Sequence, residues 1–230
     1  DLYRNGKTDV YDSLVPFVTE RRASNSRPLN IFLLTDGQST VSDKPDNKTF
    51  IRKIALKNAA TVSIYTVSCG EKTNRPLLDL LAVTNRGVPL YRESVKGLQD
   101  ALLEFLSGHS EIIVSNLTYN LTGNIGDSVY PDQLPHLYRS ETLSLYGRVP
   151  KNVQVVGGQL VGRDAEYNVE ELVFRGRIAD AEKVDNRIKR RWGAQKAFHL
   201  LVEKIMTSSP QAQAELQDII EEYNLNVPAL

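Results

Sequence analysis

The sequence predicts an α/β chain that begins with a partial, doubly wound parallel sheet, continues with an antiparallel β segment and ends in a pair of helices. Three observations support this. Residues 31–34 are apolar without alternation, which is typical of a strand covered on both faces. Helix and strand patterns then alternate to about Gly108, which favours parallel strands with right-handed crossovers. After Ser110 the patterns become strand-like and are separated by glycines. We expect three segments, residues 1–108, 109–180 and 181–230.

The first segment should contain four helices and three strands. Thr8 or Asp9 can cap a helix that runs to about Thr19, and Asp46 or Asn47 can cap the next one. The other elements are a strand over 29–34, a strand over 62–67, a helix over 75–85, a strand over 88–91 and a helix that ends at Gly108.

The second segment should be mostly strands and the third mostly helices. Strand patterns cover residues 111–119, 128–130, 143–148, 153–161 and 167–174, with turns at Gly123, Gly126, Gly147, Gly157, Gly158 and Gly162. Helical stripes then follow, one formed by Phe198, Leu201, Val202 and Ile205 and one formed by Leu216, Ile219, Ile220 and Tyr223. Pro210 suits the first turn of the last helix.

Composition excludes several classes of protein. Lys+Arg and Asp+Glu both number 28, so no basic excess favours nucleic acid as a partner. No apolar run approaches the roughly 20 residues that span a bilayer. The single cysteine, Cys69, excludes a disulfide-dense miniprotein, leaves a periplasmic or surface location open, and is expected to be a small, half-buried residue.

A carboxylate follows the apolar strand directly. Asp36 falls at the carboxyl end of that strand, where open α/β sheets place their ligands, and Gly37 forms the turn. The hydroxyls of Thr35, Ser39 and Thr40 are near, and hard oxygen donors suit a divalent cation such as Mg²⁺. An ordinary Asp-Gly turn is the alternative, and the dipeptide alone favours it.

Longer stretches resemble the von Willebrand factor A domain, and within that family the branch of the inter-α-trypsin inhibitor heavy chains and their bacterial and fungal relatives. The matching stretches are residues 5–14, the run Thr35-Asp36-Gly37-Gln38-Ser39-Thr40, and residues 129–135, 190–194 and 223–230. The first metal-binding loop of the family, Asp-x-Ser-x-Ser, is absent. The first strand of the family's sheet also has no counterpart before Thr8, so the chain looks like the carboxyl-terminal part of a larger protein, whose upstream segment or another chain would complete the sheet.

The resemblance implies a cation site. Thr8 would bind the metal directly, Asp36 would bind it directly or through water, and Gly37 and Ser39 would support the loop. The metal would be Mg²⁺, or Mn²⁺ or Ca²⁺, bound weakly or not at all by these residues alone. From spacing alone, Thr8 is more simply a helix cap. Asp9 and Asp12 suit the helix amino terminus rather than a metal.

The predicted function is a non-enzymatic module that binds a protein or matrix partner through a carboxylate offered to the cation, in an extracellular, cell-surface or periplasmic setting. A structural scaffold without a working metal site is the alternative. An enzyme is disfavoured, because the sequence lacks the phosphate-loop, dinucleotide-binding and nucleophile-elbow motifs. The basic cluster formed by Lys183, Arg187, Lys189, Arg190 and Arg191 is better explained as a solvated helix approach, with Trp192 packing inward, than as a patch for an anionic polymer.

Overall fold

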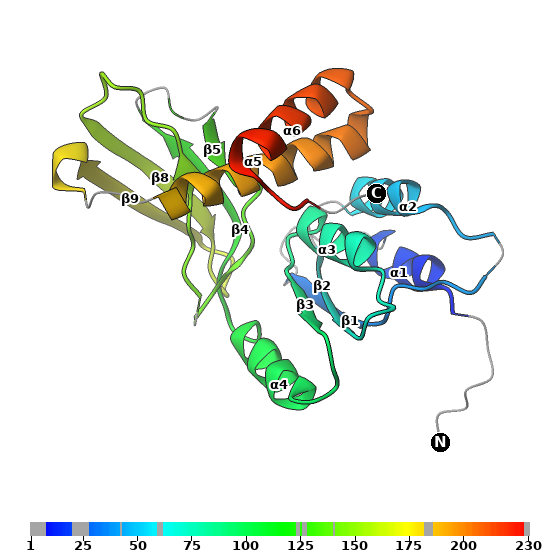
Figure 1. Cartoon of the computed structure of the whole chain (residues 1–230). Coiled ribbons are helices and arrows are strands. Elements are labelled where there is room, and N and C mark those ends of the chain that lie inside the picture. Colours follow the sequence, from blue (N-terminus) through cyan, green and yellow to red (C-terminus); the bar gives the residue numbers. More distant parts are fainter. Residues whose placement is uncertain are drawn as a thin grey trace. The chain divides into compact units, whose positions relative to one another are not determined.

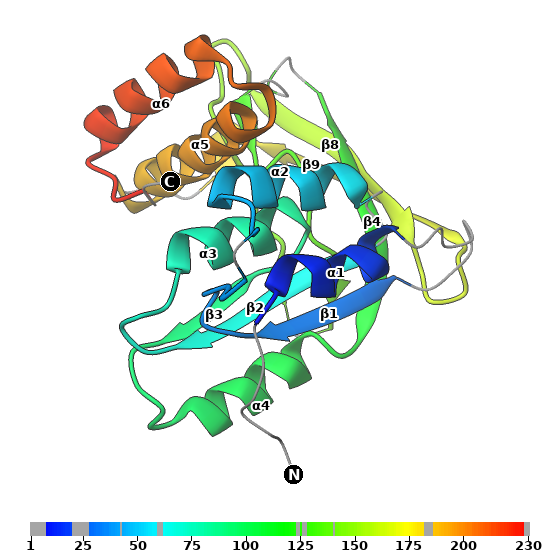
Figure 2. The same ribbon diagram turned by 90° about the vertical axis from the view of Figure 1, so that its right-hand side faces the viewer.

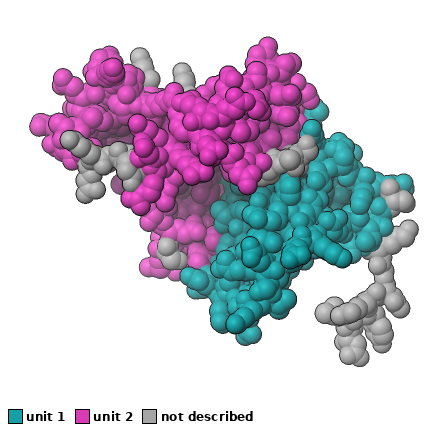
Figure 3. Space-filling view, viewed as in Figure 1, with its two compact units in different colours: residues 1–107, 228–230 teal, residues 108–227 magenta. Residues whose placement is uncertain are grey.

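The chain is described by a computed structural model that covers residues 8–19, 28–41, 43–58, 62–122, 125, 128–139, 141–181 and 186–227. Outside these ranges lie several residues to which the sequence analysis assigned roles, namely residues 5–7, Gly123, Gly126, Lys183 and 228–230. The described residues divide into two compact units, with the boundary between Ser107 and Gly108 (Figure 3). The finer division into three segments stays a prediction.

The first unit is a three-stranded parallel sheet with helices on both faces. Its elements are α1 (Val10–Thr19), β1 (Leu29–Leu34), α2 (Asn47–Lys57), β2 (Val62–Cys69), α3 (Arg75–Thr84), β3 (Pro89–Arg92) and α4 (Leu98–Gly108). The strand order is β1-β2-β3, and Leu29 of β1 pairs with Val62 of β2. Figure 2 shows α1, α2 and α3 on one face of the sheet and α4 on the other. The predicted parallel strands and crossovers are confirmed.

Strand β2 forms the centre of this unit. Every residue of β2 except Cys69 is buried, and Cys69 is half-buried as expected. On the α4 side, Phe32 of β1 stacks on Tyr65 of β2 with ring centroids 4.9 Å apart, and the ring of Phe105 meets both edge-on. Strand β1 lies at the edge of the described sheet, and Leu34 at its end is 60% exposed.

The second unit combines two antiparallel sheets with two helices (Figure 1). Its elements are β4 (Ile112–Leu121), β5 (Val129–Tyr130), β6 (Leu137–Tyr138), β7 (Tyr146–Gly147), β8 (Val155–Arg163), β9 (Val169–Arg177), the 3₁₀ helix η2 (Ile178–Asp180), α5 (Asn186–Thr207) and α6 (Pro210–Tyr223). The order of the larger sheet is β6-β4-β8-β9, and β5 pairs with β7. The antiparallel segment and the helical pair are confirmed, whereas the predicted strand over 143–148 is reduced to Tyr146–Gly147.

Helix α5 packs on the smaller sheet through its tryptophan. The indole Nε1 of Trp192 donates a hydrogen bond to the carbonyl of Ser128 at 2.7 Å, and the guanidinium of Arg148 lies 3.9 Å from the indole ring centre. Trp192 is buried while Arg190 and Arg191 are exposed, as expected for a solvated helix approach. None of the helices in the described ranges has the length and apolar character that a bilayer crossing requires.

Candidate functional site

The loop after β1 is a tight turn built around Asp36. The backbone N–H of Thr35 still donates to the carbonyl of Val67 on β2 at 3.1 Å, which extends the ladder by one residue. The backbone N–H of Gln38 then donates to Asp36 Oδ1 at 2.9 Å, and the N–H of Gly37 donates to Thr35 Oγ1 at 3.1 Å. Such local side-chain bonds are typical of Asp and Thr in turns. As a result, the Asp36 side chain is exposed at the carboxyl end of β1.

Gly37 is required by both its backbone angle and its surroundings. Its φ is +72°, in the left-handed region that favours glycine, and a Cβ placed on it would lie 3.1 Å from Asn74 Cβ and 3.1 Å from Leu78 Cγ. Gly37 is buried although its neighbours Asp36 and Gln38 are exposed. The predicted role of Gly37 in shaping the loop therefore has a local steric basis.

Asn74, just before α3, holds the loop in place through hydrogen bonds. Its N–H donates to the carbonyl of Asp36 at 2.8 Å, and its side-chain amide exchanges hydrogen bonds with the amide of Asn47 at 3.1 and 3.2 Å. Its side chain also reaches the carbonyl of Gly37 at 3.4 Å. The sequence predicted Asn47 only as a possible helix cap and did not single out Asn74, the residue directly before α3.

Thr8 joins the same loop through its backbone. Its carbonyl accepts from the Thr40 N–H and from the Ser39 hydroxyl, both at 2.9 Å, and its N–H donates to Thr40 Oγ1 at 2.6 Å. The structure thus brings Thr8 to the loop that carries Asp36, 28 residues further along the sequence, at one end of the sheet.

The amino terminus of α1 is capped by Asp9 rather than by Thr8. Asp9 Oδ1 accepts from the Asp12 N–H at 2.9 Å. Among the residues that the structure describes, the Thr8 hydroxyl has no hydrogen-bond partner. The simpler interpretation of Thr8 as a helix cap is therefore wrong, and no described residue occupies its hydroxyl.

The donors gathered here are hard oxygen atoms, the class that Mg²⁺ and Ca²⁺ prefer. They are few in number. In the described parts of the chain no three His, Cys, Asp or Glu side chains are grouped as a metal site would need. The chemistry of Thr8 and Asp36 thus fits a hard divalent cation, but two side chains do not make a full coordination shell.

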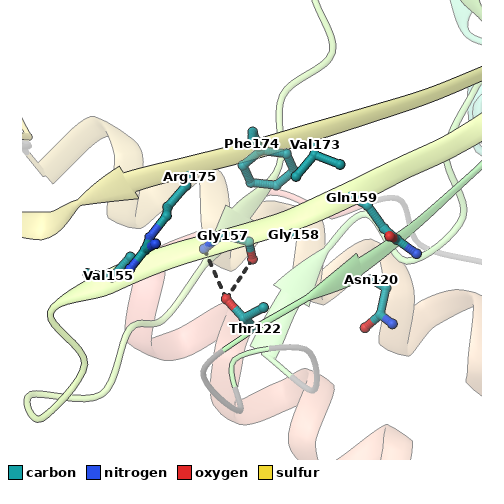
Figure 4. A pocket seen from close by; sticks show the side chains of 9 residues that line it. All are labelled: Asn120, Thr122, Val155, Gly157, Gly158, Gln159, Val173, Phe174 and Arg175. Carbon is teal, nitrogen blue, oxygen red and sulfur yellow. Dashed lines mark hydrogen bonds between the residues drawn. The ribbon is translucent and has the colours of Figure 1, made fainter.

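A separate hollow of about 580 Å³ lies on the larger sheet of the second unit (Figure 4). Its rim includes the amides of Asn120 and Gln159 and the guanidinium of Arg175. Thr122 closes one end, where its hydroxyl is bonded to both the N–H and the carbonyl of Gly157. None of the nine lining residues carries a carboxylate, imidazole or thiol, so the hollow offers hydrogen-bond donors and acceptors but no acid–base group.

Comparison with solved structures identifies the fold. The chain is similar to the crystal structure of the ArnB paralog VWA2 from Sulfolobus acidocaldarius, with a TM-score of 0.55 and 15% identity over 98% of this chain and 64% of that one. A von Willebrand factor type A protein from Catenulispora acidiphila matches with a TM-score of 0.46 and 16% identity over 87% of this chain and 57% of that one. The chain therefore spans less than two thirds of either structure. No protein-family model and no curated protein matches the sequence.

The likeness to VWA2 is one of fold, since the identity is only 15%. It supports the predicted von Willebrand factor A-like architecture for this chain, with its parallel sheet, antiparallel sheet and helices.

Proposed function

We propose that this chain is a non-enzymatic binding module of the von Willebrand factor A type, related to the heavy-chain branch, whose loop after β1 takes part in holding one divalent cation. The cation, Mg²⁺ by preference, would accept a carboxylate oxygen from a protein partner. The observation that supports this most directly is the set of three hydrogen bonds that joins Thr8 to Ser39 and Thr40, in the loop that exposes Asp36.

Each residue has a distinct part in this proposal. Thr8 supplies its hydroxyl to the metal, and Asp36 supplies the carboxylate oxygen that the Gln38 N–H does not occupy, directly or through water. Gly37 and Ser39 hold the loop in shape. Further ligands come from outside the described residues, from the segment or chain that also pairs with the edge strand β1. Because Mg²⁺ keeps several waters when it has few protein ligands, binding by this chain alone is weak.

A paramagnetic titration tests the site without knowledge of the partner. Mn²⁺ added to the isotopically labelled chain should selectively broaden the NMR amide signals of Thr8 and of residues 35–40. Asp36→Ala should abolish this effect, whereas Asp43→Ala, which removes another exposed carboxylate on the same connection, should leave it intact. Uniform broadening, or broadening that survives Asp36→Ala, would refute the proposed site. Micromolar Mg²⁺ affinity in a calorimetric titration would contradict the weak binding expected of so few ligands.

The alternative, a structural scaffold, is favoured by one feature of the same loop. Asp36 Oδ1 already accepts from Gln38, and the Ser39 hydroxyl already donates to Thr8, so the turn is stable without a metal. Under this alternative, association with any partner survives both Asp36→Ala and removal of divalent cations by a chelator. Under the leading proposal, either treatment abolishes it.

A further inference from the structure

Strand β9 forms an open edge of the larger sheet in the second unit. It is the last strand in the order β6-β4-β8-β9, and it pairs with β8 along its whole length. Val169 is 63% exposed, Leu172 60% and Val173 70%. A long edge strand with exposed apolar side chains is a template for pairing with another strand unless charge or proline blocks it, and β9 contains no proline.

The outward-facing backbone groups of β9 can be assigned from its pairing with β8. The Ile178 N–H donates to the Gln154 carbonyl, and the Asp164 N–H donates to the Asn168 carbonyl. Hydrogen-bonded pairs alternate along an antiparallel ladder, so the even-numbered residues of β9 bond to β8. The N–H and C=O groups of residues 169, 171, 173, 175 and 177 therefore point to the open edge. In the described part of the chain no strand pairs with this side.

The charges along β9 are arranged so that the strand is complementary to itself. Glu170 and Glu171 occupy its first half, while Arg175 and Arg177 occupy its second. In an antiparallel pair of two copies centred on Val173, Glu171 of each copy lies directly opposite Arg175 of the other. Opposite charges placed across a strand pair stabilise it. The same register places Leu172 opposite Phe174, and it makes the outward-facing residues the hydrogen-bonded pairs.

Neighbouring registers lose part of this match. A pair centred on Leu172 places Glu171 opposite Val173 and makes no charge pair. A pair centred on Phe174 brings Glu171 to Arg177 but leaves Arg175 opposite Val173. Only the register centred on Val173 satisfies the charges of Glu171 and Arg175 while keeping apolar side chains opposite each other.

We infer that β9 is a dimerisation strand, through which two copies of this chain form one continuous antiparallel sheet about a two-fold axis at Val173. Such an interface is isologous, so it closes at the dimer. The opposite edge of the sheet is the two-residue strand β6, which is too short to extend the assembly in the same way.

The test compares variants of the full chain by sedimentation equilibrium over a range of concentrations. The unchanged chain should shift from 25.8 kDa towards twice that mass as its concentration rises. Val173→Pro removes an outward-facing N–H without touching the bonds to β8, so it should give a monomer. Val173→Ala keeps the donor and should still dimerise. Trp192 fluorescence and circular dichroism check that each variant is folded.

Charge exchange tests the register independently of proline. Glu171→Arg alone creates two repulsive pairs and should raise the dimer dissociation constant by about tenfold or more. Adding Arg175→Glu restores opposite charges and should return the constant to within about threefold of the original. A chain that stays monomeric at all concentrations, a folded Val173→Pro dimer, or a double variant as weak as Glu171→Arg would each overturn the inference. Protection of the Val173 amide from hydrogen exchange in the monomer would also overturn it, because another segment would then cover this edge.

Discussion

Replacing Gly37 with alanine should destabilise the first unit through two separable effects. The first is backbone strain, because φ is +72° at Gly37 and a side chain in the left-handed region costs roughly 1–2 kcal/mol. Alanine also restricts the unfolded chain, which offsets about 0.4–1 kcal/mol of that cost. The second effect is steric. The new Cβ would lie 3.1 Å from atoms of Asn74 and Leu78, and such overpacking costs about 1–3 kcal/mol. The total expected loss is about 2–4 kcal/mol.

Gly97 provides a matched control in the same unit. Its φ is +74°, almost that of Gly37, but a Cβ placed there would meet no atom within 4 Å. Gly97→Ala should therefore show only the backbone effect, a loss of about 1 kcal/mol. The difference between the two variants isolates the contact of the loop with Asn74 and Leu78.

Native-state hydrogen exchange of the buried β2 amides measures the free energy of opening of the first unit. Trp192 is the only tryptophan and belongs to the second unit, so its fluorescence reports whether that unit is unchanged. Equal stabilities for Gly37→Ala and Gly97→Ala would refute the reasoning, because the buried contacts of Gly37 would then contribute nothing.

Two further predictions concern the rest of the chain. His199 Nδ1 lies 3.3 Å from Asp132 Oδ2. This hydrogen bond raises the pKa of His199 above its ordinary value of 6.5 and lowers the pKa of Asp132 below its ordinary value of 3.8, and Glu203 is a weaker neighbour of His199. The stabilisation from His199 is complete below pH 6.5 and is lost as the pH rises through its raised pKa. That from Asp132 is complete above pH 3.8 and is lost as the pH falls through its lowered pKa. Urea unfolding followed by Trp192 fluorescence should show a contribution of at most about 1 kcal/mol between these limits, and His199→Asn should remove it; an unchanged pH profile would contradict this. Gly87→Ala would place a Cβ 1.9 Å from the Ile64 carbonyl oxygen and should lower the free energy of opening, measured by hydrogen exchange, by more than about 3 kcal/mol. A loss like that of Gly97→Ala would be inconsistent with the close approach of the turn between α3 and β3 to strand β2.

The parallel sheet was predictable because its signals are local. Residues 31–34 are an apolar run and residues 62–67 are rich in β-branched side chains, and each segment ends at a turn. Asp46 is one of the two helix caps that the sequence predicts, and its carboxylate accepts a hydrogen bond from the Thr49 N–H. The strand at Leu137–Tyr138 was missed because two residues carry no periodicity. Its pairing with β4, across more than 20 residues of sequence, is what makes it a strand.

The helical stripes show a different limit. In α5 the sequence favoured Phe198 and Val202 as inward-facing residues, but the structure buries Ala197 and Leu200 with Leu201 and Ile205. Helix α6 packs closely on α5 at Gly193, where a Cβ would lie 2.6 Å from the Tyr223 ring. The face that a helix buries thus depends on tertiary contacts, which the spacing of its apolar residues does not predict.

The candidate site was predictable only in part. The exposed carboxylate at the end of β1 follows from a strand that ends in Asp-Gly, and that much is local. The contact of Thr8 with Ser39 and Thr40 joins residues more than 30 positions apart, so the family resemblance suggested it and spacing did not. The support that Asn74 and Asn47 give the loop was missed because it depends on a bond between their amides and on a bond from Asn74 to the Gly37 carbonyl, which no linear pattern encodes.

The position of Asn74 makes the loop mechanically dependent on two helices. One residue touches the Asp36 carbonyl, the Gly37 carbonyl and the side chain of Asn47 at the start of α2, and it is followed directly by the first turn of α3. Displacement of the Asp36 turn would therefore move the amino-terminal ends of both helices with it, or break the hydrogen bonds between the Asn47 and Asn74 amides. A ligand that binds at this end of the sheet would therefore shift α2 and α3, and a movement of either helix would change the position of the Asp36 carboxylate.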